Sequence, residues 1–201
     1  MTPDTVTLTT TSFSTRPVPP LQAHSLAGHN GEVQQLPESA SYTATAVPFQ
    51  VLVVCSGNIC RSPMGEKVLQ RAFTDAGLSE RVTVSSAGTG NWHVGQGAHE
   101  PAERVLAAAS YPTVHTVRQV TAEMVDAAGL VLAADHGHYR TLRAMAADPT
   151  HVQMLRSFDP DADAEDVPDP YGHSDAAYRE VLAMLEAAAP GIVDAVKAQL
   201  I

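Results

Sequence analysis

Both cysteines of this chain lie in one short stretch, VLVVCSGNICRSPMGE, which covers residues 51–66. Cys55 follows an apolar run typical of a buried strand, and Arg61 follows Cys60 directly. A lone cysteine at a strand end is usually an apolar filler, but this spacing of cysteine and arginine is far more specific. A zinc site would need about four ligands, and no second pair of ligands stands at a matching spacing. The stretch also lacks the Gly-Lys-Ser/Thr ending of a Walker phosphate loop.

The residues between Cys55 and Arg61 suit an anion-binding loop. The first three of them are small: Ser56, Gly57 and Asn58. Glycine and asparagine easily adopt a left-handed backbone, which turns successive N–H groups inward, and the next helix adds its positive N-terminal end. The Arg61 fork fits two phosphate oxygens, and Ser62 can donate a hydrogen bond to the sulfur. The same field favours the thiolate of Cys55, so residues 55–61 are predicted to form a nucleophile and a phosphate cradle together.

Attack of a thiolate on phosphorus expels an oxyanion, which needs a proton from a general acid. The candidate donor is Asp169 in the segment VPDPYG, where Pro168 and Pro170 stiffen the loop on either side. Asp-Pro pairs mostly initiate turns, and Asp159-Pro160 is interpreted as such a turn. Asp169 is preferred because of the cysteine loop, not because of its own dipeptide.

Strand and helix patterns alternate after residue 48. The expected strands cover residues 49–55, 82–88, 130–135 and 152–158. The expected helices cover residues 62–78, 100–111, 121–129, 138–148 and 174–189, and Pro190 is expected to kink or break the last one before residues 191–200. This alternation predicts an α/β fold with a small parallel four-stranded sheet flanked by helices. Cys55 would lie at the carboxyl end of a strand, where ligand sites of such sheets are found.

Composition sets the broad class of the protein. Residues 1–47 are rich in Thr, Ser, Pro and Gln without a sustained period, so we expect a disordered extension before a domain at residues 48–201. The net charge of −10 argues against nucleic acid as a partner. No apolar run reaches the roughly 18 residues that span a membrane. Two cysteines six positions apart form no disulfide framework, so a reducing cytoplasm is the expected compartment.

Five segments together make the chain resemble the low-molecular-weight protein tyrosine phosphatases of bacterial type. These segments are VCSGNICRSPMGE (54–66), SSAGTGNWHVG (85–95), VHTVRQVT (114–121), VLAAD (131–135) and VPDPYG (167–172). The resemblance covers roughly residues 49–200 and leaves the extension outside. It implies the phosphatase I-like fold and hydrolysis of protein phosphotyrosine through a cysteinyl-phosphate intermediate. Around residues 136–139 the sequence HGHY departs from the polar Ser-Asn-Leu run of the family, which leaves open what packs around Asp135.

The resemblance also assigns roles to individual residues. Cys55 is the implied nucleophile, Arg61 the phosphoryl-binding group and Asp169 the acid. The implied substrate-binding residues are Ser56, Gly57, Asn58, Ile59, Cys60, Ser62, Trp92 and Tyr171, with the last two as aromatic walls for a phosphotyrosine ring. The implied supporting residues are Ser86, His115 and Asp135. No metal and no cofactor are expected.

Three alternatives stay open beside this interpretation. An arsenate reductase of the same fold needs further cysteines, and this chain has none beyond Cys60. A protein-arginine phosphatase of the same family carries threonine after the loop asparagine, where this chain has Ile59. A phosphoprotein-binding module without catalysis would not need Cys55, Arg61 and Asp169 together. The partners implied are phosphotyrosine-bearing proteins, with a cognate tyrosine kinase among the candidates, and inhibition by phosphate or vanadate is expected.

Overall fold

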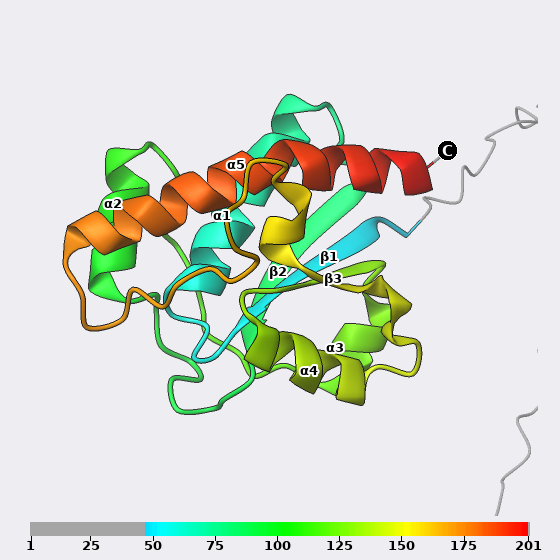
Figure 1. The fold of residues 1–201 in the computed structure, drawn as a ribbon, viewed down its shortest axis with the longest axis horizontal. Helices are drawn as coiled ribbons and strands as arrows, with labels where there is room; N and C mark the ends of the chain where they lie inside the picture. The colour runs from blue at the N-terminus through cyan, green and yellow to red at the C-terminus, as the bar shows by residue number, and fades with distance from the viewer. Residues whose placement is uncertain (1–46, 201) are drawn as a thin grey trace, which may run out of the picture. The chain divides into compact units, whose positions relative to one another are not determined.

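The computed structural model describes residues 47–200. The expected disordered extension, apart from Val47, lies outside the described residues. In the described part, four parallel strands form one sheet in the order β2-β1-β3-β4 (Figure 1). The strands are β1 (Phe49–Cys55), β2 (Val82–Gly88), β3 (Leu130–Ala133) and β4 (Val152–Met154). The predicted α/β class with a small parallel four-stranded sheet is confirmed.

Helices cover both faces of the sheet because alternate residues of β1 point to opposite sides. Val51 and Val53 belong to the core beneath α1 (Arg61–Asp75) and α5 (Asp175–Gln199). Leu52 and Val54 belong to a second core. This second core lies under α3 (Ala122–Ala127) and α4 (His136–Met145), and in Figure 1 these two helices lie together, away from α5. The third helix on the α1 side is α2 (Glu100–Ala108), which packs against α5.

The predicted fourth strand is longer than the one observed. Only residues 152–154 pair with β3, and the chain then turns into the 3₁₀ helix η2 (Leu155–Phe158); a second 3₁₀ turn, η1 (Pro149–His151), precedes β4. Arg156 explains the early end, because its guanidinium is buried and donates hydrogen bonds to the Asp166 carbonyl and the Asp163 carboxylate. Arg156 thereby anchors the acidic loop that leads to Asp169.

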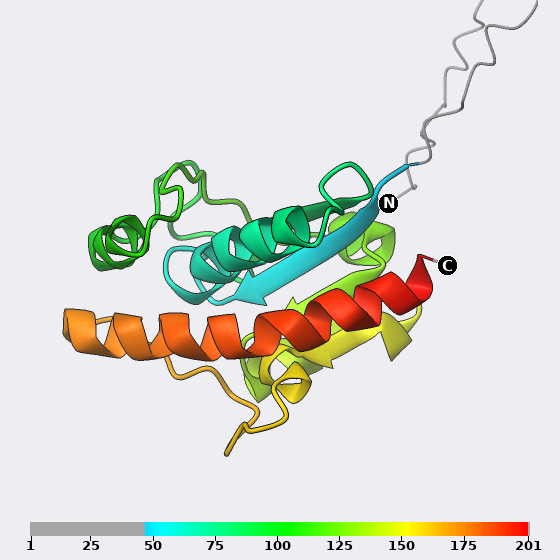
Figure 2. The same cartoon turned by 90° about the horizontal axis from the view of Figure 1, so that it is seen from above.

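Pro190 does not break the last helix, contrary to the prediction. α5 runs without interruption from Asp175 to Gln199, as Figure 2 shows from above. Pro190 is exposed, so water can hydrate the carbonyl that loses its helical partner. The apolar side chains on both sides of it remain buried, including Leu185 and Ile192, and their burial holds the two halves on one axis. None of the helices among residues 47–200 is both long and apolar enough to cross a membrane.

The carboxyl ends of the strands gather the segments that the sequence singled out. β1 ends at Cys55 and β2 at Gly88, and these two residues pair in the sheet register. Ala134, just after β3, donates its N–H to the Val54 carbonyl and accepts from Val167 N–H. The loop before α1, the loop after β2 and the acidic loop therefore meet at one edge of the sheet.

Candidate active site

The loop between β1 and α1 encloses the base of a cavity of about 210 Å³. Its lining combines loop residues with residues of two other segments: Cys55, Ser56, Gly57, Ile59, Cys60, Arg61, Trp92, His93, Asp169 and Tyr171. α1 begins at Arg61, and no side chain caps its first turn. The positive end of this 15-residue helix therefore faces the loop, as predicted.

Asn58 holds the loop in shape through a network of hydrogen bonds, called the brace below. It is fully buried and adopts a left-handed backbone with φ 55°. Its side-chain amide donates to Ser62 Oγ and Ser86 Oγ, both at 2.9 Å, and its Oδ1 accepts from the Arg118 N–H. The Asn58 carbonyl oxygen lies 3.0 Å from His115 Nε2. Two of the three predicted supporting residues, Ser86 and His115, are therefore in direct contact with Asn58, whereas Asp135 contacts Arg61 instead.

Glu66 completes this brace and was not predicted from the sequence. Its carboxylate accepts a 2.5 Å hydrogen bond from Ser86 Oγ and also contacts Lys67 Nζ. Glu66 Oε2, the oxygen that accepts from Ser86, also lies 3.9 Å from His115 Nδ1. Burial lowers the pKa of His115 although Glu66 opposes this shift. The only sequence signal for Glu66 was its place on the first turns of the helix after the loop.

The sulfur of Cys55 lies 3.0 Å from Ser62 Oγ. Ser62 accepts from the Asn58 amide and has a single proton to donate, either to Cys55 or to the Ala87 carbonyl at 3.2 Å. When the sulfur is a thiolate it is the stronger acceptor, so the proton of Ser62 turns toward it. The predicted contact between Ser62 and Cys55 is present.

Arg61 is held by a carboxylate on each side. Its guanidinium is only 4% exposed, and Nη1 donates to Asp135 Oδ2 at 2.9 Å and to the Val167 carbonyl at 3.2 Å. Nη2 donates to Asp169 Oδ2 at 3.0 Å and to Ser56 Oγ at 3.3 Å. Nε is buried and has no hydrogen-bond partner among the described residues. The Nε–Nη2 edge of the fork is thus the less satisfied one.

His138 is a second residue that the sequence did not reveal as part of the site. It belongs to the HGHY run, is buried, and places Nε2 2.9 Å from Ser56 Oγ and Nδ1 2.8 Å from Asp135 Oδ1. Burial lowers the pKa of His138, although the Asp135 charge opposes this shift. Burial alone would raise the pKa of Asp135, but the His138 N–H, the His138 ring and Arg61 lower it below its usual value. His138 therefore occupies the position around Asp135 that the departure from the family pattern had left open.

The thiol of Cys60 is buried rather than exposed. It is buried at the N-terminus of α1, and its sulfur lies 3.5 Å from the Tyr178 hydroxyl of α5. Burial raises the pKa of Cys60 to about 12, and the Tyr178 hydrogen bond opposes this only in part. Cys60 is therefore a protonated thiol at neutral pH.

Two exposed aromatic rings stand at the mouth of the cavity. Trp92 is 70% exposed and Tyr171 57% exposed. The Trp92 ring lies over Gly90, where a Cβ would overlap it, so glycine at residue 90 lets the ring lie against the backbone. Tyr171 is two residues after Asp169 and donates its N–H to Asp169 Oδ1. His93 also lines the cavity, beside Gly57, and was not among the predicted residues.

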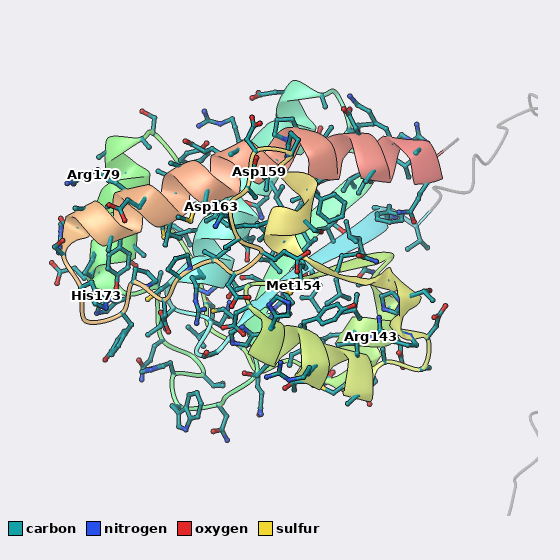
Figure 3. All side chains as sticks on the ribbon, viewed as in Figure 1. Arg143, Met154, Asp159, Asp163, His173 and Arg179 are labelled. Carbon is teal, nitrogen blue, oxygen red and sulfur yellow. The ribbon has the colours of Figure 1, made fainter. Side chains whose placement is uncertain are left out.

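All the site residues predicted from the sequence thus meet at the carboxyl edge of the sheet, within the cavity or directly behind it. Asp159, which was interpreted as a turn residue, lies outside this group. Figure 3 labels Asp159 beside η2, far along the acidic loop from His173, which lies two residues after Tyr171 and before α5. Within residues 47–200, no three side chains of His, Cys, Asp or Glu are grouped so that they could hold a metal ion.

An α/β sheet with a cysteine–arginine anion loop at its carboxyl edge defines the structural class of the chain. A family model described as low molecular weight phosphotyrosine protein phosphatase matches residues 50–200. The chain therefore belongs to that family, and the resemblance inferred from its motifs is confirmed.

Individual relatives agree with this membership. A Mycobacterium tuberculosis protein named low molecular weight protein-tyrosine phosphatase A is 48% identical over 155 residues, which cover 76% of this chain and 94% of that protein. A solved protein tyrosine phosphatase from Entamoeba histolytica is similar with a TM-score of 0.73 at 26% identity, covering 76% of this chain and 99% of its own. Bacillus subtilis YwlE, described as an arginine phosphatase, has a TM-score of 0.67 at 28% identity, covering 74% and 96%.

Gly88 offers a test of how tightly the loop is held. A Cβ on Gly88 would lie 2.7 Å from the Ser56 carbonyl oxygen and 2.9 Å from the Asn58 nitrogen, both backbone atoms. We expect Gly88→Ala to displace the loop and to raise the Kd for inorganic phosphate about tenfold or more, measured by isothermal titration calorimetry. Gly97→Ala is the control, because its Cβ would meet only the flexible end of Glu103. Unchanged phosphate affinity in Gly88→Ala would show that the loop does not depend on this contact.

The state of Cys60 offers a second test. Because alkylation requires a thiolate, and the pKa of Cys60 is raised to about 12 by burial, we expect iodoacetamide at pH 7 to spare Cys60 and to label Cys55. Peptide mass spectrometry of the labelled protein measures this directly. Cys60→Ser should be labelled at Cys55 at the wild-type rate. Labelling of Cys60 before Cys55 would contradict the assignment of Cys60 as a buried thiol.

Proposed function

We propose that this chain hydrolyses phosphotyrosine in proteins through a cysteinyl-phosphate intermediate. The observation that carries the proposal is the arrangement at Arg61, whose buried guanidinium keeps the Nε–Nη2 edge less satisfied beside the sulfur loop. That edge matches the two equatorial oxygens of a phosphoryl group bound in the loop. Membership of the phosphotyrosine protein phosphatase family supports the same activity.

In the first step, the Cys55 thiolate attacks phosphorus and forms an S–P bond while the P–O bond to the tyrosyl oxygen breaks. Asp169 gives its proton to the departing phenolic oxygen, so that tyrosine leaves as a neutral phenol. The loop N–H groups and Arg61 stabilise the negative charge on the equatorial oxygens. Each of these groups lines the same cavity.

We infer that the substrate replaces the ion pair between Arg61 and Asp169 when it binds. A general acid must reach the leaving oxygen, whereas Asp169 Oδ2 lies 3.0 Å from Arg61 Nη2. A phosphoryl oxygen bound to Nη2 would replace Asp169 there and leave its carboxyl group beside the leaving oxygen. Asp135 would keep Nη1, because it contacts the opposite edge of the guanidinium.

In the second step, a water molecule attacks the cysteinyl phosphate and the S–P bond breaks. Asp169, now a carboxylate, takes a proton from this water, and inorganic phosphate is released. Ser62 donates its hydrogen bond to the Cys55 thiolate that leaves. The cycle thus regenerates the Cys55 thiolate and the protonated Asp169.

Trp92 and Tyr171 are proposed to bind the aromatic ring of the substrate from two sides of the cavity mouth. A protein-arginine phosphatase is the second candidate, since YwlE, described as an arginine phosphatase, has the same fold. Ile59 favours the tyrosine substrate, because its apolar side chain lines the cavity where the arginine-specific members carry threonine. A binding module without turnover is disfavoured, because it would not need the acid beside the nucleophile.

We also infer a cytoplasmic enzyme that acts on phosphotyrosine-bearing proteins and opposes a tyrosine kinase. The two reduced, buried cysteines support a reducing compartment. Phosphate and vanadate are expected inhibitors, because both are tetrahedral oxyanions that fit the loop. The catalytic steps above use only protein side chains and water, so they need no cofactor. A domain starting at residue 48 remains our proposal for the chain's organisation.

The direct test is turnover on matched peptides that carry phosphotyrosine, phosphoserine or phosphoarginine. We expect phosphotyrosine to have the highest kcat/KM, and Cys55→Ser to abolish turnover while still binding phosphate, because the cradle is made of backbone groups and Arg61. Release of inorganic phosphate and calorimetric titration of the variant measure the two results. Preference for phosphoarginine would favour the second candidate, and wild-type turnover by Cys55→Ser would exclude the cysteinyl-phosphate intermediate.

A general acid matters in proportion to how much the departing oxygen needs a proton. We expect Asp169→Ala to slow phosphoenzyme formation about 10²–10⁴-fold for phosphotyrosine and clearly less for p-nitrophenyl phosphate, whose leaving group is more acidic. Pre-steady-state kinetics on aryl phosphates of graded leaving-group pKa measures this dependence. Asp159→Ala is the matched control and should behave as wild type. If Asp169→Ala shows the wild-type dependence on the leaving group, the acid lies elsewhere.

A further inference from the structure

The hydroxyl of Tyr178 lies behind the active-site loop and bridges two groups. It is 2.6 Å from His99 Nδ1 and 3.5 Å from Cys60 Sγ. Tyr178 is fully buried on α5, and this burial raises its pKa, so it is a neutral phenol that must satisfy its hydroxyl inside the protein. Neither Tyr178 nor His99 lines the cavity, and the hydrolysis proposed above uses neither.

His99 contacts three separate parts of the site. Its backbone N–H donates to the Ile59 carbonyl at 2.7 Å, which ties it to the loop. It stands just before α2 but makes no side-chain cap, so its ring is free to turn toward α5. There Nδ1 meets the Tyr178 hydroxyl, and the ring packs against Tyr171 with 5.0 Å between ring centroids. His99 therefore connects the buried phenol to the exposed aromatic wall of the cavity.

Apart from the His99 ring, few contacts hold the ring of Tyr171 in place. It is largely exposed and follows the proline-flanked Asp169. Its backbone N–H bonds to Asp169, but among residues 47–200 its hydroxyl has no hydrogen bond and His99 is the ring that packs on it. The orientation of an exposed ring with a single aromatic contact depends on that contact.

We propose that His99 is a positioning residue for the aryl group of the substrate. Tyr178 fixes the His99 ring, and the His99 ring holds Tyr171 at the wall of the cavity. The inference rests on the proposed phosphotyrosine hydrolysis and deepens it by naming what prepares the ring-binding wall. Inorganic phosphate reaches the loop but not the wall, so His99 should affect the binding of aryl phosphates and leave the binding of phosphate unchanged.

The experiment compares His99→Ala, His99→Phe and Tyr178→Phe with wild type on a phosphotyrosine peptide, with inorganic phosphate as competitive inhibitor. We expect His99→Ala to raise KM about 3–10-fold with nearly unchanged kcat and unchanged Ki for phosphate. His99→Phe keeps a ring against Tyr171 and should recover most of the lost affinity. Tyr178→Phe keeps the core volume but removes the anchor, and should raise KM by less than His99→Ala.

A double-mutant cycle with Tyr171→Ala separates the proposed role from a structural one. If His99 acts through Tyr171, His99→Ala should add nothing to KM in the Tyr171→Ala background. An equal rise of KM in both backgrounds, or a rise of the phosphate Ki that matches the rise of KM, would overturn the inference. Wild-type protein without turnover on the peptide would instead overturn the proposed function, and this inference with it. Urea unfolding of each variant shows whether the compared proteins are folded.

Discussion

The left-handed, buried conformation of Asn58 is the constraint on which the site depends. A loop that turns its N–H groups inward cannot form its own regular hydrogen bonds, so it needs partners from outside. Asn58 recruits them from two strand-linked segments, through Ser86 of β2 and the Arg118 N–H, and from α1 through Ser62. Leaving one such buried partner unpaired costs about 1–3 kcal/mol, which is large against the free energy of unfolding of a typical domain. The loop therefore keeps its shape only while β2 and α1 keep theirs.

Arg61 and its hydrogen-bond partners place the charges around this loop. Arg61 is buried, which is tolerable because Asp135 and the Val167 carbonyl satisfy one edge of the guanidinium. Asp135 also contacts His138, and Ser56 contacts both His138 and Arg61. These contacts form a closed ring that ties α4 to the loop. The chain as a whole carries a net charge of −10, so the attraction for a phosphoryl group is local. It comes from Arg61, the loop amides and the end of α1.

The long helix α5 links the site to the core from the opposite side. It crosses the sheet face beside α1 (Figure 1). Its buried Tyr178 lies next to the loop, with its hydroxyl 3.5 Å from Cys60 Sγ. Its uninterrupted course through Pro190 depends on close packing, since Gly191 lies so near the Phe158 carbonyl that a Cβ would overlap it. A break at Pro190 would free the C-terminal half of α5 from η2, the turn that precedes the acidic loop carrying Asp169. Helix continuity and the placement of the acid are thus linked through packing.

Local pattern was enough to predict the four parallel strands, the anion loop at residues 55–61 and the family, because each depends on residue types at fixed short spacing. It was also enough to nominate Asp169 over Asp159, once the loop was recognised. It failed at Pro190 and at the end of β4, where burial of Ile192 and of Arg156 overrides local preference. Glu66, His138, His99 and Tyr178 carry no motif of their own, and only the folded chain brings them to the loop from four separate helices or helix ends. Their contacts join residues far apart in sequence, and such contacts depend on how the helices pack rather than on any local spacing.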